Sequence, residues 1–435
     1  MTADTDTVVV GAGVAGLAAA AALRRAGSDC VVLETSSRVG GRAWTAFPPA
    51  LGGAAFDHGA SWLHAAERNP LAELAHAHGD ALAGSGEDWT RHVRIGERRA
   101  TEGEMAAYDH AWTRFEAVAG ERAGQVPDTS LADALAGLRD DPWTATVETF
   151  EATLIAAADP KDFSVRDWHL NELTGSNLTV PGGLGALVAR RLAPLAGPVR
   201  LDSPVTRIAW DRPGGGVVAT TPSGDVAARA CIVTVSTGVL AAGTIGFDPP
   251  LPADRRAAID GLPMGLLTKV ALRAATPERF GLAPGTSLHR WVAHAGEPAM
   301  FFLAWPDGQD HLLGFVGGPA AWELSRAGPA ATEAFARAEL RRLLGAEAAF
   351  AGAVVTGWGG NPAFAGAYAY ARPGCAGARA AMDAPLAERL WFAGEAWCSD
   401  GLAGTVGGAF RSGEAAARAA LRVIGGATRE TGWGA

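Results

Sequence analysis

The sequence predicts an α/β protein in which a parallel-sheet domain, assembled from separated segments, is interrupted by an inserted α+β domain. Three observations support this fold class. A strand, a glycine-rich turn, a helix and a second strand follow one another over residues 8–34. Alanine, leucine and charged residues then recur at helical spacing over 69–167, and a buried-type strand and a helix close the chain at 390–424. Because 435 residues are too many for one ordinary core, we expect two domains.

The glycine-rich turn follows the apolar strand at 8–10 and contains Gly11, Gly13 and Gly16. The first glycine allows the tight bend, the second lets backbone approach a diphosphate, and the third lets the helix lie close to the strand. The helix N-terminus adds unpaired N–H groups and a positive dipole end. Glu34 comes 18 residues after Gly16, at the tip of the second strand, where a carboxylate can bind both hydroxyls of a ribose. This context predicts a Rossmann-like dinucleotide-binding unit but does not choose between NAD and FAD.

Composition excludes several other classes of protein. Hydrophobic residues make up 48% of the chain and charged residues 19%, as in a folded globular protein. The net charge of −9 argues against a general nucleic-acid binder. The cysteines Cys30, Cys231, Cys375 and Cys398 are far apart, so we expect neither a disulfide framework nor a metal site. The acidic N-terminus leads directly into the first strand, and no apolar stretch is long enough to span a bilayer, so a cytoplasmic protein without a membrane partner is expected.

Two polar or glycine-rich passages follow the second strand. The loop at 36–42 places Arg38 and Arg42 beside the dinucleotide turn, and their guanidiniums match phosphate oxygens. The passage at 52–64 spaces its glycines so that backbone can lie against a flat ligand.

The rest of the chain divides between the two expected domains. The helical stretch at 69–167 is predicted to belong to a substrate domain, and a further helix is expected to run from 184 to 195. Later strands are predicted at 199–201, 205–210, 217–220, 230–235, 268–272, 300–305, 311–316 and 390–392, and a last helix at 405–424. We therefore expect the nucleotide-binding domain at 1–66, 181–250 and 352–435, and the substrate-binding domain at 67–180 and 251–351.

The motifs form an ordered set along the whole chain. They are the glycine turn with Glu34, then 38–42, 59–64, Lys269, 358–370, and 392–395 with 404–409. In this order the set closely resembles the flavin-containing amine oxidases, the family of monoamine oxidases, polyamine and spermine oxidases and the flavin-dependent histone demethylase.

The resemblance implies FAD as the cofactor. It places the diphosphate on the glycine turn, the adenosine ribose on Glu34, the adenine at the backbone of Val205, and Glu395 beside the ribityl and phosphate portion. The last helix, opened by Thr405 and Val406, would direct its N-terminal N–H groups toward the flavin. The expected cofactor-binding residues are Gly11, Gly13, Gly16, Glu34, Arg38, Gly41, Arg42, Gly59, Ala60, Ser61, Trp62, Val205, Trp358, Gly394, Glu395, Thr405 and Val406. Ala367 stands where monoamine oxidases carry the cysteine that bonds the flavin, so non-covalent FAD is expected.

The resemblance also implies catalytic residues. Lys269 matches the lysine that holds a water against flavin N5, and a buried lysine has a readily shifted pKa. Without the resemblance, a surface lysine on a strand is the commoner interpretation. Tyr368 matches one wall of the aromatic cage that orients the amine, while the opposite wall falls on Thr405. For Tyr368, packing in the core is the alternative interpretation.

Two further residues are expected near the substrate. His64 stands where polyamine oxidases also carry histidine and could bond an amine nitrogen, although a loop histidine satisfied by the protein remains an alternative. Glu172 could face the cationic end of a substrate, and a solvated acid is its alternative. His76 and His78 have no partners at metal-ligand spacing and are expected at the surface.

The sequence thus predicts FAD-dependent oxidation of a small-molecule amine, either a polyamine or a monoamine, with dioxygen as electron acceptor and hydrogen peroxide as product. An L-amino-acid oxidase is an alternative, with Arg290 or Arg273 as anchor for a carboxylate. A carotenoid-desaturase-like enzyme shares the FAD motifs, but Lys269 and Tyr368 count against it. A flavin-binding protein without turnover also stays open, and the oligomeric state is not predicted.

Overall fold

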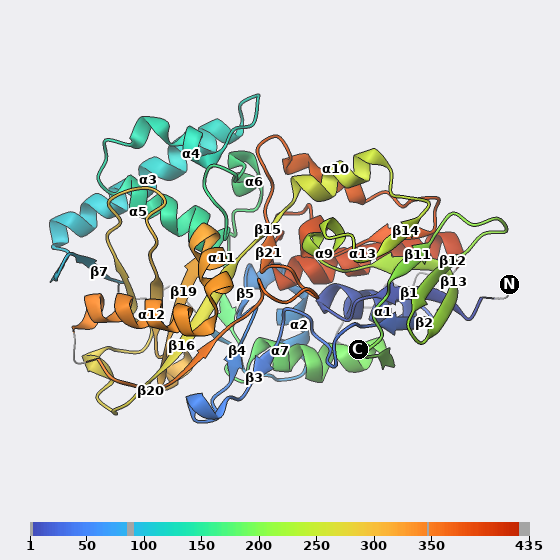
Figure 1. Ribbon diagram of the computed structural model, residues 1–435, viewed down its shortest axis with the longest axis horizontal. Helices are drawn as coiled ribbons and strands as arrows, with labels where there is room; N and C mark the ends of the chain where they lie inside the picture. Colours follow the sequence, from blue (N-terminus) through green and yellow to red (C-terminus); the bar gives the residue numbers. More distant parts are fainter. Residues whose placement is uncertain (1–2, 85–90, 346–347, 426–435) are drawn as a thin grey trace.

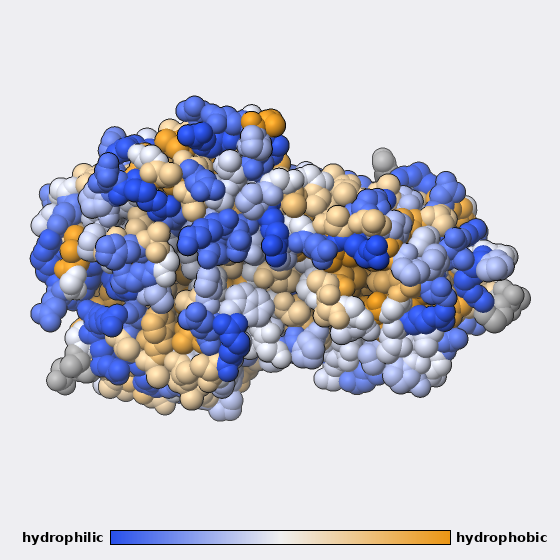
Figure 2. Space-filling model, turned by 45° about the horizontal axis from the view of Figure 1, so that its top comes forward, coloured by the Kyte–Doolittle hydropathy of each residue, from blue (hydrophilic) through white to orange (hydrophobic). Residues whose placement is uncertain are grey.

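The computed structural model describes residues 3–84, 91–345 and 348–425. Two lobes lie side by side along the longest axis, each built around one large sheet, and the chain passes between them several times (Figure 1). The lobe at the left is the broader one, and its surface carries many hydrophilic residues (Figure 2). No helix among these residues is long and apolar enough to cross a membrane.

The first sheet has eight strands and contains the N-terminal strand near its middle. Its order is β10-β2-β1-β13-β12-β11-β14, with β22 paired to β13. The strands are β1 (Thr5–Val10), β2 (Cys30–Leu33), β10 (Val199–Arg200), β11 (Arg207–Ala209), β12 (Val217–Thr221), β13 (Gly224–Val233), β14 (Gly246–Asp248) and β22 (Leu390–Phe392). The pairs β1–β2, β1–β13 and β13–β22 are parallel, so their carboxyl ends meet at one edge of the sheet.

Helices cover one face of this sheet closely. Helices α1 (Val14–Arg25) and α13 (Val406–Ile424) pack against each other on it, and a Cβ on Gly413 would lie 2.0 Å from the carbonyl oxygen of Ala15. Alternate residues of β1 belong to hydrophobic cores on the two faces of the sheet. Val9 packs with these helices, and Val8 and Val10 pack on the opposite face.

The second sheet has seven strands, in the order β20-β16-β19-β18-β17-β7-β8. They are β7 (Arg91–Ile95), β8 (Arg98–Arg99), β16 (Leu267–Ala274), β17 (Ser287–Arg290), β18 (Phe301–Ala304), β19 (His311–Gly317) and β20 (Phe350–Val355). Residues of one face pack in a core with α11 (Gly318–Ala327) and α12 (Pro329–Leu344). The opposite face carries a separate cluster that includes Ala271, Leu303, Leu313 and Phe315.

The remaining elements connect the two sheets or enlarge one of the two lobes. The helices are α2 (Pro70–Ala77), α3 (Glu102–Ala123), α4 (Leu131–Ala134), α5 (Thr144–Glu148), the π-helix η4 (Thr149–Ile155), α6 (Val165–Leu170), α7 (Leu184–Leu187), the π-helix η5 (Val188–Leu192), α8 (Ala193–Ala196), α9 (Thr237–Ala241) and α10 (Ala253–Gly261). The short strands are β3 (Thr45–Ala46), β4 (Phe56–Asp57), β5 (Trp62–Leu63), β6 (Ala83–Gly84), β9 (Leu178–Thr179), β15 (Met264–Gly265) and β21 (Tyr368–Ala369).

Most predicted elements are confirmed, including the first strand–turn–helix–strand unit, the strands β16, β18 and β19 of the second sheet, and the last helix. The interpretation of 69–167 as helical was wrong for β7 and β8, which extend the second sheet beyond β17. Only Val93 of β7 is buried, so this strand near the edge of the sheet lacks the apolar run that would reveal it. The strand β20 spans the expected domain boundary at 352 and pairs with β16.

Candidate active site

The turn between β1 and α1 has the geometry of an anion-binding helix start. Gly11 adopts φ +103°, and a Cβ on Gly16 would lie 1.9 Å from the carbonyl oxygen of Gly11. Gly13 caps the helix without a side-chain hydrogen bond, and no heavy atom lies within 4 Å of the place where its Cβ would stand. Open space therefore adjoins the start of α1 at Gly13, which suits a bound diphosphate.

Glu34 is held at the mouth of this turn. It is 5% exposed, and its Oε2 accepts a hydrogen bond from the backbone N of Ala12 at 2.6 Å. Its Oε1 accepts from the backbone N and the Oγ of Ser36 at 2.8 and 2.6 Å. Oε2 has a further lone pair, so the group can also accept from a hydroxyl of a nucleotide ribose.

The two arginines of the 36–42 loop have different partners. Nη1 of Arg38 donates to the carbonyl of Gly41 at 2.8 Å, and its guanidinium lies 4.5 Å from the ring centre of Trp44. Nη1 of Arg42 instead donates to the carbonyl of Ala367 at 2.7 Å and to Oε1 of Glu395 at 2.8 Å. Arg42 thereby ties the N-terminal loop to the last part of the chain.

The C-terminal residues expected at the cofactor gather at the start of α13. Glu395 is buried and accepts from the backbone N of Ala369 at 3.3 Å. Oγ1 of Thr405 caps α13 by accepting from the backbone N of Gly408 at 3.0 Å, and it donates to Leu402 O at 2.8 Å. The hydroxyl of Thr405 is thus engaged with backbone, and Val406, the first residue of the helix, is buried behind it.

Lys269 projects from β16 toward the first lobe. It is 4% exposed, and its Nζ donates to the carbonyl of Asp57 at 3.2 Å, to the carbonyl of Gly59, and to Ser61 Oγ at 2.5 Å. The ammonium also lies 5.6 Å from the ring centre of Trp62. Burial lowers the pKa of Lys269 to about 8, and the Asp57 carboxylate partly offsets this. The lysine is therefore an internal cation whose proton is more easily lost than that of a surface lysine.

Asp57, which sequence reasoning missed, holds in place the segment that binds Lys269. Its Oδ2 accepts from Leu184 N at 2.9 Å, while its Oδ1 accepts from Gly185 N at 3.2 Å and from Thr45 Oγ1 at 2.5 Å. Burial raises the pKa of this carboxyl group. The sequence does contain one indication of this contact. Gly183, before α7, has no side chain that could cap the helix, so the cap must come from another part of the chain.

His64 and Asn177 form a second polar pair close to Trp62. The Nδ1 of His64 lies 2.7 Å from Asn177 Oδ1, and the rings of His64 and Trp62 are 6.3 Å apart. Burial lowers the pKa of His64, so the ring is neutral at physiological pH. Glu172, in contrast, is exposed. Burial raises the pKa of Glu151 to about 7, and the negative charge of Glu172 contributes to this rise.

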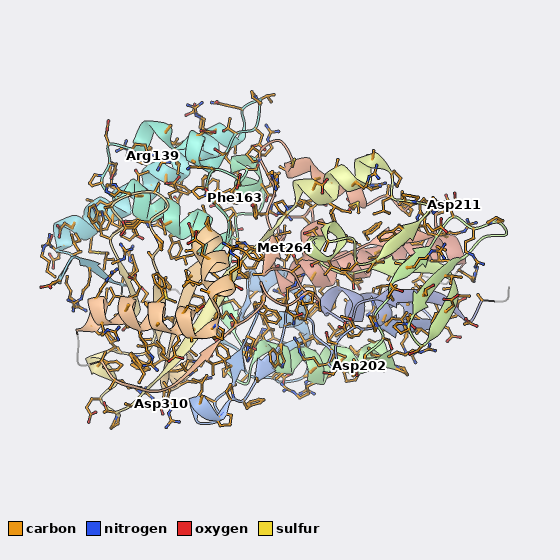
Figure 3. All side chains as sticks on the ribbon, in the orientation of Figure 1. Arg139, Phe163, Asp202, Asp211, Met264 and Asp310 are labelled. Atoms are coloured by element: carbon orange, nitrogen blue, oxygen red, sulfur yellow. The ribbon has the colours of Figure 1, made fainter. Side chains whose placement is uncertain are left out.

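Tyr368 lies at the junction of the lobes, where β21 pairs with β15. Its hydroxyl donates to the carbonyl of Leu154 at 3.2 Å, and burial raises its pKa. Met264 of β15 marks this junction in Figure 3. Trp358 is buried and its Nε1 donates to the carbonyl of His58 at 2.8 Å, whereas Val205 is buried just before β11. The remaining expected cofactor residues Gly41, Ala60 and Gly394 lie in the loops that connect these groups.

A cavity of about 560 Å³ opens beside Ser61 and Trp62. Its wall includes apolar residues of the second sheet and of β4, and it continues to the turn between β18 and β19. A partly open cavity of this size, separated from Lys269 by its contact Ser61, suits a small organic substrate.

A model of the flavin-containing amine oxidoreductase family matches residues 14–421. The chain belongs to this family. Polyamine oxidase 4 of Oryza sativa subsp. japonica is 29% identical over 441 residues, which cover 95% of this chain and 88% of that protein. Cyclohexylamine oxidase from Brevibacterium oxydans IH-35A has a similar structure, with 23% identity, a TM-score of 0.79, and coverage of 97% of this chain and 100% of the other. A putrescine oxidase with redesigned cofactor binding has the same TM-score and 23% identity, covering 96% and 99%.

These matches confirm the resemblance and the predicted fold class. Membership in the family makes the protein a flavin-dependent oxidoreductase that oxidises amines. The chemistry of the residues fits such a cofactor, because the helix starts at Gly13 and Thr405 offer N–H groups for negative charge and the carboxylate of Glu34 offers an acceptor for a hydroxyl.

Proposed function

We propose that this amine oxidase binds FAD non-covalently and oxidises the C–N bond of a polyamine or a monoamine, with dioxygen as acceptor and hydrogen peroxide as product. The observation that carries this proposal is Lys269, a buried cation held by three oxygen atoms from the Asp57–Ser61 segment beside Trp62. Such a group is costly to bury, and this cost is typical of a residue retained for chemistry.

FAD is favoured by the fit of both ends of a dinucleotide. Glu34 suits the adenosine ribose, the start of α1 suits the diphosphate, and the start of α13 suits the negative charge of a reduced ring. The position before Tyr368 is Ala367, which has no nucleophile to bond the cofactor.

When bound, the flavin takes the hydride equivalent from the amine carbon and passes the electrons to dioxygen. The chain contributes positioning and proton control. Tyr368 forms a fixed ring wall for the amine, because its hydroxyl is anchored to Leu154 O. Lys269 carries a proton with a pKa of about 8, and its three N–H groups are donated to Asp57, Gly59 and Ser61, so it can hold a water in exchange for one of these contacts. The neutral His64 can accept a hydrogen bond from an amine. The imine product then hydrolyses to a carbonyl compound.

An amino-acid oxidase is less well supported. Arg290, one of the candidate carboxylate anchors, donates to Glu339 Oε2 at 3.1 Å and to Glu297 Oε1 at 2.6 Å. Its charge is thus already paired, and a substrate carboxylate would have to displace an acid.

The test is anaerobic bleaching of the purified yellow enzyme with a panel of polyamines, monoamines and amino acids. We expect bleaching with amines that lack a carboxylate, followed by peroxide release on addition of air. Bleaching by amino acids alone would transfer the assignment to the amino-acid oxidases, and a protein that no amine bleaches would be a flavin-binding protein without turnover. We also propose that the enzyme works in the cytoplasm, which cell fractionation can check.

A further inference from the structure

One face of the second sheet connects Lys269 with a distant polar group. In the ladder between β16 and β19, Lys269 pairs with Phe315, and Arg273 pairs with His311. Directly paired residues, and residues two apart on a strand, point to the same face of a sheet. Lys269 and His311 therefore share a face, and four residues of strand separate their levels by about 13 Å.

The part of this face between them is apolar. Ala271, Leu303 and Leu313 belong to one buried cluster with Phe56 of β4. The cavity beside Ser61 is lined by Phe56, Leu303 and Leu313, so it follows this face away from the lysine. An unbranched alkyl chain fits such a trough because its walls offer contacts without hydrogen-bonding groups.

Polar side chains line the far end of the cavity. They are Asp307 of the turn η7 (Pro306–Gly308), Gln309 and His311. Asp310, next to this group in sequence, marks the position of the turn at the lower edge of the left lobe, away from Met264 at the junction (Figure 3).

Two of these polar groups lack partners. His311 is 3% exposed, and within the described part of the chain its Nδ1 has no hydrogen-bond partner. The same holds for the buried Oε1 of Gln309. Buried polar atoms are normally paired, and leaving them unpaired costs free energy. Asp307, an exposed residue, lines the cavity together with them, and its Oδ1 accepts from Thr179 Oγ1 at 2.8 Å.

These groups select a hydrogen-bond donor with a positive charge. Burial lowers the pKa of His311 to about 4, against the opposing charge of Asp310, so the imidazole is neutral and has one acceptor nitrogen. The amide oxygen of Gln309 and the carboxylate of Asp307 are acceptors as well. An ammonium group carries three donors and matches this set.

The neighbouring charged side chains do not reverse this preference. Asp310 forms an ion pair with Arg279 and does not line the cavity. Arg273, opposite His311 in the ladder, packs its Nη1 against the turn at Gly52, where a Cβ would come within 3.1 Å of it.

We propose that Asp307, Gln309 and His311 form a distal subsite that binds the far ammonium group of an elongated diamine or polyamine whose reacting amine lies beside Lys269. The subsite rests on the proposed amine oxidation and adds selectivity for chain length to it. A monoamine of the same length leaves the two unpaired acceptors unsatisfied, so the diamine is preferred by on the order of tenfold or more.

The test compares α,ω-diaminoalkanes, n-alkylamines and ω-amino carboxylates of increasing and matched length as substrates of the purified holoenzyme. We expect the ratio of kcat/KM for diamine over alkylamine to rise once the chain reaches the subsite. In Asp307→Asn this ratio should fall about tenfold through KM, because a charge-assisted hydrogen bond is lost without a change of size. Asp310→Asn is the matched control, and its ratio should equal that of the wild type.

Direct binding separates this inference from the proposed function. Isothermal titration of the longest diamine into the dithionite-reduced, oxygen-free enzyme, which cannot turn the amine over, should show weaker binding in Asp307→Asn than in Asp310→Asn. If no amine is oxidised, amine oxidation fails while this comparison still decides the subsite. Equal ratios and equal binding in the two variants would overturn the subsite, and so would a preference for the carboxylate-ended series.

Discussion

Replacing Lys269 by methionine tests the most unusual group of the site. The structure lowers the pKa of this lysine from 10.5 to about 8, which corresponds to about 3 kcal/mol disfavouring the buried ammonium. Near pH 7 about nine in ten molecules still carry the proton, and near pH 9 only about one in ten do. If the ammonium assists reduction of dioxygen, the reoxidation rate of the wild type should fall by about tenfold over this range. The methionine variant should be slower and lack this titration.

The assay is stopped-flow mixing of the anaerobically reduced enzyme with oxygenated buffers across this pH range. Lys161→Met is the matched control, because Lys161 is exposed and is the other of the two lysines in the sequence. The variant's flavin absorbance shows whether the cofactor is retained. Equal rates and the same pH profile in Lys269→Met and Lys161→Met would refute the role of the lysine.

The same pKa shift predicts a stability difference with a definite sign. Between about pH 8 and pH 10.5 the unfolded chain binds the proton of Lys269 more tightly than the folded chain, so stability rises with pH in this window. Relative to Lys269→Met, the free energy of unfolding of the wild type should therefore increase by about 3 kcal/mol across the window, as measured by urea denaturation.

Three further substitutions test the cofactor cradle and the junction. Gly16→Ala should lose flavin, because its Cβ would stand 1.9 Å from Gly11 O. Gly120→Ala on α3 is the control and should keep flavin, because no heavy atom lies within 4 Å of its Cβ. The ratio of flavin to protein absorbance measures both. Glu34→Gln should weaken FAD binding about tenfold or more in equilibrium dialysis. Unchanged affinity would show that this carboxylate does not bind the ribose. Asp167→Ala should cost about 3–5 kcal/mol in urea denaturation, because it leaves Arg379 buried without its ion pair, and a loss near zero would contradict this.

Local patterns in the sequence were enough for the elements that carry the cofactor motifs. The turn from Gly11 to Gly16 and the cap at Thr405 depend on contacts within a few residues, so their chemistry is readable along the chain. The strand β7 was not readable, because it pairs with β17 almost two hundred residues later and buries only Val93 fully.

The partners of the site residues could not be predicted for the same reason. Asp57 caps a helix that begins at Leu184, and His64 meets Asn177, so each contact spans more than a hundred residues. A pattern of residue types carries no information on such pairs until the lobes are docked. The resemblance supplied positions such as Lys269 and Tyr368, but it did not supply what holds them.

The contacts of Lys269 explain why the two lobes work as one enzyme. The lysine belongs to the second sheet, whereas its three acceptors belong to a segment whose Asp57 also caps α7. Any shift between the lobes would therefore leave a buried ammonium without its acceptors, at a cost of several kcal/mol. The same docking fixes Tyr368, whose strand pairs with β15 next to β16 and whose hydroxyl holds Leu154. The stability of the interface and the placement of the reacting groups thus depend on one set of contacts, so substitutions at Asp57 should alter the amine site and the fold together.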